Sequence, residues 1–180
     1  TTVGQRAQNN QEFDNLLECG ALCNHALFAP GEGSKPIEKR GTTSDPSEGA
    51  ILKFCHSYIS VYDVREAHTE VACIPFTSAA KWMAVIIKEE KGHRIVIKGA
   101  PERVMERCST HGKDNQDLTE EIRRDIDEAN REVAENGERV MAFGEMWLPD
   151  IAHGFEFDCD GEETYNFPVK NMRFVGILAM

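Results

Sequence analysis

Residues 82–98 read WMAVIIKEEKGHRIVIK, and this stretch decides the fold class. Two runs rich in Ile and Val, 82–88 and 93–98, flank the polar segment 89–92, which ends in Gly92. Such runs on both sides of a short polar turn are typical of a β-hairpin. We therefore expect two antiparallel strands here, in a sheet that helices cover.

The segments on both sides of this hairpin alternate between helical and strand periodicity. Apolar residues recur at helical spacing in 11–28, 46–58, 101–108 and 119–136. Shorter apolar runs, typical of strands, cover 71–73, 138–148 and 173–180. This order predicts an α+β fold, a twisted antiparallel β-sheet flanked by helices, as a single domain over 1–180 with a loose lead-in at 1–10.

Length and charge exclude several classes of protein. A chain of 180 residues suits one domain with a sizeable core. The net charge of −11 would repel a nucleic-acid backbone or an anionic membrane surface. The longest unbroken apolar run, 82–87, is far shorter than the roughly 20 residues of a spanning helix. We expect no nucleic-acid partner and no membrane span within these residues.

The ends of the chain and its cysteines suggest its context. The first residue is Thr1 rather than Met, and the apolar run 173–180 stops at the last residue, so we expect a piece of a longer protein. The six cysteines form no CxxC pair, and most occupy apolar positions of periodic segments. Reduced core thiols and a cytosolic location therefore fit better than a disulfide framework.

Familiar catalytic and metal motifs are missing. The sequence has no GxxxxGK[ST], GxGxxG, HExxH or GxSxG pattern, so most classes of stand-alone enzyme lose support. Cys19, Cys23 and His25 are close enough in sequence to suggest zinc. However, Cys19 and Cys23 lie one turn apart on an apolar helix face, and no fourth ligand pattern follows. Core packing and the absence of a metal site are the main expectation, with a zinc domain as the alternative.

The segment 114–138 is strongly acidic, with ten acidic and three basic residues. A solvated helix face explains this charge most simply. The alternative is an acidic interaction module that docks a basic partner through this helix.

The segment IKGAPER, residues 97–103, is the best candidate for a ligand site. A strand of Ile and Val delivers Lys98 at its end, Gly99 leaves no bulk beside it, and Pro101 begins a helix. The ammonium group of Lys98 can then face a ligand that approaches closely. A surface lysine before a tight turn is the competing interpretation.

Five blocks together resemble a known family. KGAPER (98–103) occurs with DPSEGAILK (45–53), IPF (74–76) followed by Lys81, GERV (137–140) and NFPVKNMRFVGILAM (166–180). In this order they resemble the nucleotide-binding domain of P-type cation-transporting ATPases, and are most similar to the catalytic alpha subunits of sodium/potassium and proton/potassium pumps. The resemblance implies a cytoplasmic domain of an integral membrane protein of the plasma membrane, with phosphorylation and actuator domains on the same chain and a beta subunit beside it.

The resemblance also implies which residues contact ATP. Phe76 is similar to the aromatic residue on which adenine stacks, and Glu48 to the glutamate that meets the adenine amino edge. Lys98, with Gly99 next to it, resembles the lysine that lines the base pocket, and Lys81 a second pocket lysine.

Further positions match the family or depart from it. Arg139 resembles the arginine that meets the phosphates, and Met141 an apolar wall for the base. Asp45 matches an acid at a helix start, where an N-cap role is equally expected. Met83 stands where sodium pumps usually place a glutamine, and Gly144 where they place a cysteine.

The resemblance implies that this domain and the rest of the parent enzyme carry out different steps. This domain would hold the purine end of ATP and bring the γ-phosphate to the aspartate of a DKTG motif in a separate domain that also helps to hold Mg²⁺. Because DKTG, TGD and TGES are absent here, we expect an inactive, monomeric fragment that binds ATP with high-micromolar to millimolar affinity. A sodium/potassium pump is favoured, with a calcium or other cation pump as the alternative.

Overall fold

The hairpin expected at 82–98 forms strands β2 (Trp82–Glu89) and β3 (Gly92–Gly99). They pair in antiparallel register, from Trp82 opposite Gly99 to Glu89 opposite Gly92. The computed structural model describes residues 10–148, 151, 154–160 and 164–180. Of the lead-in expected at 1–10, only Asn10 lies within the described residues, where its side chain caps the first helix.

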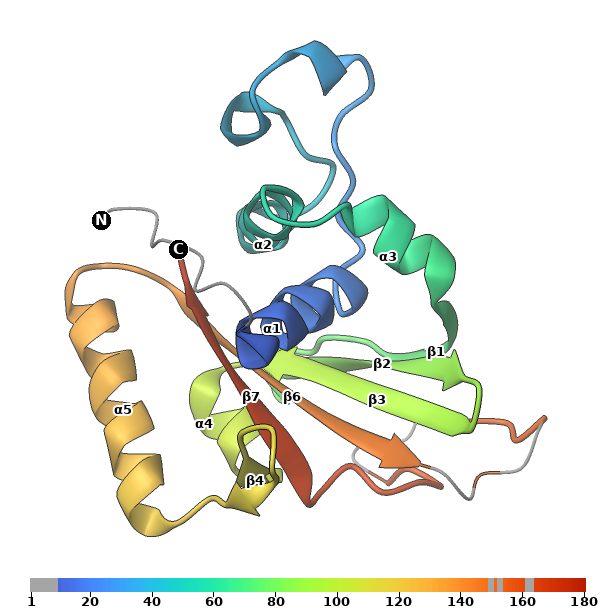
Figure 1. Ribbon diagram of the computed structural model, residues 1–180, viewed down its shortest axis with the longest axis vertical. Helices are drawn as coiled ribbons and strands as arrows, with labels where there is room; N and C mark the ends of the chain where they lie inside the picture. Colours follow the sequence, from blue (N-terminus) through green and yellow to red (C-terminus); the bar gives the residue numbers. More distant parts are fainter. Residues whose placement is uncertain (1–9, 149–150, 152–153, 161–163) are drawn as a thin grey trace.

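Seven strands of the described chain form one twisted sheet in the order β1-β2-β3-β6-β7-β4-β5 (Figure 1). The remaining strands are β1 (Thr69–Ile74), β4 (Cys108–His111), β5 (Gln116–Asp117), β6 (Val140–Leu148) and β7 (Met172–Ala179). The neighbours pair antiparallel, as expected, except that β4 runs parallel to β7. The predicted α+β class is therefore confirmed, and the parallel pair is an addition to it.

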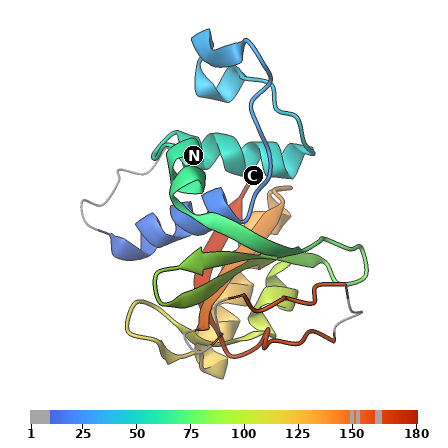
Figure 2. The same ribbon diagram turned by 90° about the vertical axis from the view of Figure 1, so that its right-hand side faces the viewer.

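Helices cover both faces of the sheet. They are α1 (Gln11–Leu22), α2 (Pro46–His56), α3 (Val61–Ala67), α4 (Pro101–Met105) and α5 (Glu120–Glu135), with the short 3-10 turns η1 (Glu32–Ser34) and η2 (Ile37–Lys39) between α1 and α2. Figures 1 and 2 show α1, α2 and α3 on one side of the sheet and α4 and α5 on the other. Each side encloses its own apolar cluster, because alternate residues of the strands point to opposite faces.

The first helix is shorter than its apolar spacing predicts. We expected helix over 11–28, but α1 ends at Leu22. The reason is a competing local contact: the Asn24 side-chain oxygen accepts from the Ala26 amide at 2.8 Å, and its Nδ2 donates to the Glu48 carbonyl at 2.9 Å. This turn carries the chain away from the helix axis and towards α2.

One other boundary and one helix differ from the sequence prediction. The helix expected over 101–108 ends at Met105, and the chain enters β4 at Cys108. Helix α3, capped by Ser60, was not predicted, since seven residues carry too few apolar repeats to stand out.

The acidic helix α5 lies where expected, with Thr119 as its N-cap. Ile122 and Ile126 pack against the apolar cluster on this side of the sheet, whereas the acidic residues of the helix are exposed. This arrangement is typical of a solvated face. No helix in the described part of the chain has the length and apolar character that crossing a bilayer requires.

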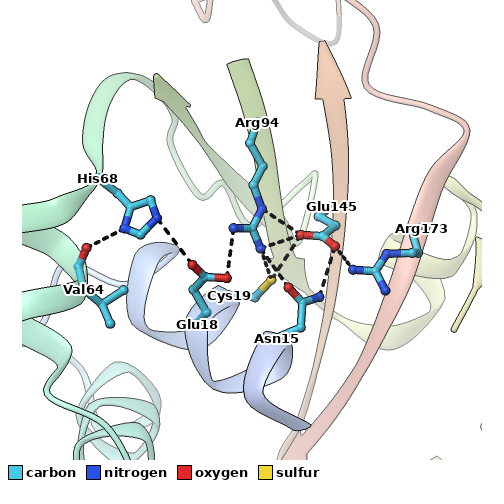
Figure 3. Close-up of polar contacts among 8 residues, drawn as sticks. All are labelled: Asn15, Glu18, Cys19, Val64, His68, Arg94, Glu145 and Arg173. Atoms are coloured by element: carbon cyan, nitrogen blue, oxygen red, sulfur yellow. Dashed lines mark hydrogen bonds and ion pairs between the residues drawn. The ribbon is translucent and has the colours of Figure 1, made fainter. Parts of the chain in front are cut away.

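A buried charge network fastens α1 to the sheet (Figure 3). The Glu145 carboxylate on β6 accepts from Arg94 Nε of β3 at 2.7 Å and from Asn15 Nδ2 of α1 at 3.0 Å, and it also pairs with Arg173 of β7. Arg94 in turn donates to Glu18 Oε2 of α1 at 3.0 Å. The side chains of Arg94 and Glu145 are only 5 % and 3 % exposed. Because water does not reach these charges, the opposite charges of the network must stabilise them instead.

The pKa of Glu145 follows from this environment. Burial raises the pKa of this carboxyl, but the guanidinium groups of Arg94 and Arg173 outweigh burial and hold the pKa below its usual range. A carboxylate whose pKa is lowered by folding contributes stability that is present above its unfolded pKa of about 4.3 and is lost as the pH falls through the folded value. Acidification below about pH 4 should therefore weaken the attachment of α1.

We predict that Glu145→Gln lowers the free energy of unfolding at pH 7 by about 3–5 kcal/mol, since it removes the carboxylate shared by Arg94 and Arg173 and leaves the buried Arg94 with only the partly exposed Glu18. Urea unfolding followed by circular dichroism measures this loss. Glu106→Gln is the control, because Glu106 forms an exposed ion pair with Arg103, and its loss should cost less than about 1 kcal/mol. Equal losses in the two variants would contradict the structural role of Glu145.

Candidate functional site

Lys98 lies at the end of β3 and points to the face that α1, α2 and α3 cover. Its cross-strand neighbours are Met83 on β2 and Phe143 on β6, and both belong to the apolar cluster on that face. The Lys98 side chain is only 1 % exposed and forms an ion pair with Glu48. The lysine that the sequence singled out is therefore a buried charge, and the alternative of a surface lysine before a turn is wrong.

Helix α2 delivers Glu48 to this lysine. Asp45 is the N-cap, and its carboxylate accepts from the amides of Ser47 at 2.9 Å and Glu48 at 3.3 Å, which confirms the capping role expected from the sequence. Pro46 occupies the first turn, where its missing amide hydrogen costs nothing. Glu48 itself sits in the first turn of the helix, where the helix dipole favours a negative charge.

The loop between β1 and β2 brings Phe76 and Lys81 to the same end of the sheet. The last residue of β1, Ile74, is opposite Ala84 of β2, and the first residue of β2, Trp82, is opposite Gly99 of β3. The loop between Ile74 and Trp82 therefore lies at the end of the sheet where β3 ends. The amide of Lys81 donates to the Thr77 carbonyl at 2.8 Å and closes the loop. Phe76 is 55 % exposed, which leaves its surface open to a ligand.

Lys81 joins this loop to the KGAPER segment through its backbone. Lys81 has a positive φ of 60°, and its carbonyl accepts from the Ala100 amide at 3.0 Å. A Cβ on Gly99 would lie 2.5 Å from that same carbonyl oxygen and 2.6 Å from Trp82 Cβ. Glycine is therefore required at position 99 because two backbone segments approach closely, a reason that sequence alone did not supply.

Arg139, just before β6, contacts the first turn of α2. Its Nη1 donates to Ser47 Oγ at 2.8 Å, and its backbone exchanges two hydrogen bonds with Met180, at 2.8 and 2.9 Å. Met141 follows on β6, half-buried, and packs against the same apolar cluster as Met83. Sequence reasoning missed Ser47 as the partner of Arg139, because a serine in a helix turn has no distinguishing spacing.

Gly144 faces away from this site. It is opposite Ile97 on β3, which belongs to the apolar cluster on the α4 and α5 side. A Cβ at position 144 would lie 3.1 Å from Ile97 Cγ2 and 3.2 Å from Cys108 Sγ. A cysteine at this position would therefore crowd that cluster, on the opposite face from Lys98.

The thiols considered as zinc ligands are separated from His25. Cys19 points to the Glu145 network, with Sγ 3.8 Å from Glu145 Oε2, and Cys23 Sγ lies 3.9 Å from the Met83 carbonyl. Both are fully buried, and burial raises the pKa of the Cys23 thiol to about 12. Their expected place in the core is confirmed, and His25 instead pairs with Glu70 at 2.8 Å.

Residues 12–180 match the family model of the P-type ATPase cytoplasmic domain N. The chain belongs to this family. The sodium/potassium-transporting ATPase subunit alpha-1 of Anguilla anguilla is 41 % identical over 175 residues, which cover 92 % of this chain and 17 % of that protein.

Two further relatives agree with this assignment. The alpha-1 subunit of Catostomus commersonii is 38 % identical over 96 % of this chain and 18 % of that protein, and the alpha-4 subunit of Rattus norvegicus is 39 % identical over 92 % of this chain and 16 % of that protein. The chain thus spans between 16 % and 18 % of the length of these relatives.

We predict that Gly99→Ala destabilises the domain by about 1–3 kcal/mol, since the added methyl group must push the Lys81 carbonyl away. Gly33→Ala is the matched control, because a Cβ there meets nothing within 4 Å and the backbone needs no positive φ. Urea unfolding of both variants measures the difference. An unchanged midpoint for Gly99→Ala would contradict the close approach of the two segments.

The Lys98–Glu48 pair allows a second test by a double-mutant cycle. Glu48→Gln should be strongly destabilising because it leaves the Lys98 ammonium buried without its carboxylate. Adding Lys98→Met should recover part of that loss, with a coupling energy of about 0.5–3 kcal/mol from unfolding measurements. Strictly additive effects would show that the two side chains do not interact.

Proposed function

We propose that this chain is the ATP-binding domain of a P-type cation-transporting ATPase, and that it holds adenine against Phe76. The observation that carries the proposal is the exposed Phe76 ring at the sheet end that also bears the Lys98–Glu48 pair. Stacking of a base on an aromatic side chain contributes about 1–3 kcal/mol. The other residues proposed for ATP are Glu48, Lys81, Met83, Lys98, Gly99, Arg139 and Met141.

The polar groups of the site suit a nucleotide. Apart from its ion pair with Glu48, the Lys98 ammonium has no hydrogen-bond partner among the described residues, so it retains donors for a base or ribose. Since Lys98 is almost fully buried, a ligand reaches it only if the side chains around it, Glu48 among them, move. Glu48 and Lys98 therefore act as one unit, and Glu48 keeps acceptor capacity for an amino group of the base.

The proposed roles of the remaining residues differ. Met83 and Met141 line the face of the sheet around Lys98 and provide apolar walls for the purine. Lys81 and Arg139 are exposed and supply positive charge for the phosphates. Gly99 acts indirectly, since it permits the approach of Lys81 to the KGAPER segment.

The net charge predicts weak binding. A chain of net charge −11 repels a polyphosphate at long range, although salt screens this repulsion beyond about 8 Å at physiological ionic strength. Stacking and a few local cations then determine the affinity. High-micromolar to millimolar binding corresponds to only about 4–6 kcal/mol, which fits a domain that positions ATP for another domain.

Phosphoryl transfer belongs to the parent enzyme in this proposal. The domain brings the γ-phosphate to the aspartate of a separate phosphorylation domain by closing towards it, which is a contribution of positioning. That other domain would hold most of the Mg²⁺, so ATP binding to this chain should depend little on Mg²⁺. We propose no catalytic residue here.

The parent that we propose is a sodium/potassium-type pump of the plasma membrane, with an actuator domain on the same chain and a beta subunit. The sequence identity of 38–41 % to sodium/potassium-transporting alpha subunits supports this choice over a calcium pump. On this view the present domain faces the cytoplasm.

We predict that Phe76→Ala weakens ATP binding several-fold or more, because the adenine loses its stacking partner. Titration calorimetry with ATP, with and without Mg²⁺, measures the affinity. Trp147→Ala is the matched control, since Trp147 is 54 % exposed but lies on β6 opposite Arg94, towards the other end of the sheet. Unchanged affinity in Phe76→Ala, or an equal loss in Trp147→Ala, would contradict the stacking role.

A further inference from the structure

Three potential metal ligands meet beside β1, two of them exposed and one half-buried. They are His25, Glu70 and Cys73, and one ligand atom of each lies within 4.8 Å of those of the other two. His25 Nε2 and Glu70 Oε2 are already 2.8 Å apart. Among the residues that the structure describes, this is the one group of three such side chains found so close together.

A β-bulge brings Glu70 and Cys73 to the same face of the sheet. In a regular strand, residues three apart point to opposite faces. In β1, however, Glu70 is opposite Ile87 while Ala72 is opposite Ile86, so Val71 is an extra residue that resets the alternation. Cys73 is then opposite Val85, and Ile87 and Val85 lie on the same face, towards α1.

The third ligand comes from the turn that ends α1. The Asn24 side chain fixes this turn through its bonds to Ala26 and Glu48, and His25 follows from the turn as an exposed side chain. His25 also lines a cavity of about 290 Å³ together with Glu70, His68 and Arg65. The cluster is thus held by two backbone segments of fixed geometry and remains open to solvent.

We propose that His25, Glu70 and Cys73 bind a zinc-type divalent transition-metal ion. Imidazole nitrogen, carboxylate oxygen and thiolate sulfur are the ligands that Zn²⁺ takes in proteins, and three of them leave a fourth position for water. A thiolate and an imidazole are poor ligands for Ca²⁺ and Mg²⁺, which select oxygen. The two negative charges of Glu70 and the Cys73 thiolate balance the charge of the ion.

Metal binding must displace protons at this site. Burial, with the charge of Glu70 next, raises the pKa of the Cys73 thiol to about 11, so the free thiol is protonated at neutral pH. The ion replaces the thiol proton, which passes to water, and it takes the Nε2 lone pair of neutral His25 in place of the contact with Glu70. Ligand atoms up to 4.8 Å apart then need only a small contraction to surround one ion.

This inference is independent of the proposed function. The ligands do not include any residue assigned to ATP, and the cluster needs neither the nucleotide nor the parent enzyme. It also differs from the zinc alternative based on Cys19, Cys23 and His25, because it contains only His25 from that group.

Cobalt(II) titration of the 180-residue chain under reducing conditions tests the proposal. Bound Co²⁺ should give the thiolate-to-cobalt charge-transfer absorption and the intense visible bands of a tetrahedral site, and Zn²⁺ should abolish them by competition. Cys73→Ser should remove the charge-transfer band. His25→Gln and Glu70→Gln should each weaken binding by about 10-fold or more, since loss of even an outer-shell partner costs about 10–100-fold.

A matched variant controls for other ligands. His68→Gln removes another histidine of the same cavity, and it should keep the bands and the affinity. Circular dichroism of each metal-free variant checks that the fold is kept, and Zn²⁺ should raise the melting temperature of the unmodified chain but not of Cys73→Ser. Any of three results overturns the proposal: the charge-transfer band is absent, it survives in Cys73→Ser, or His25→Gln leaves the affinity unchanged.

Discussion

The buried contact of Glu145 with Arg94 and Arg173 fixes how the helical layer sits on the sheet. The three residues come from β6, β3 and β7, and Asn15 and Glu18 extend the network to α1 (Figure 3). Helix α1 in turn packs against α2 and α3, so its position sets theirs. Because the side chains of Arg94 and Glu145 are almost fully buried, displacing either one would leave the other charge poorly compensated away from water.

The candidate nucleotide site depends on that placement. Lys98 is buried on the face that α1, α2 and α3 cover, and it is paired because α2 points its first turn, with Glu48, at the end of β3. Phe76 and Lys81 arrive at the same end through the β1–β2 loop, which Gly99 allows to approach. Four of the residues proposed for ATP therefore lie at one end of the sheet, and the ion pair makes two of them, Glu48 and Lys98, interdependent.

The proposed metal cluster uses the same helical layer in another way. The turn after α1 places His25 over the edge strand, and the bulge at Val71 brings Glu70 and Cys73 to meet it. Bulges commonly redirect a side chain at sheet edges, and β1 is an edge strand of this sheet. Cys73 lies three residues before Phe76, so the two candidate sites share one strand and its following loop.

The sequence by itself determined the elements whose signals are local. The hairpin at 82–98, the Asp45 cap of α2, the Thr119 cap of α5 and the α+β class follow from turn residues, caps and periodicity, and the five motif blocks indicated the family. Only the tertiary structure decided that α1 stops at Leu22, that β4 runs parallel to β7, that Lys98 is buried against Glu48 and that His25 meets Glu70 and Cys73. The physical reason is that most of these features arise from contacts between residues distant along the chain, while the end of α1 also depends on one local side-chain contact of Asn24 and the metal cluster on a single inserted residue in β1. None of these leaves a periodic trace in the sequence.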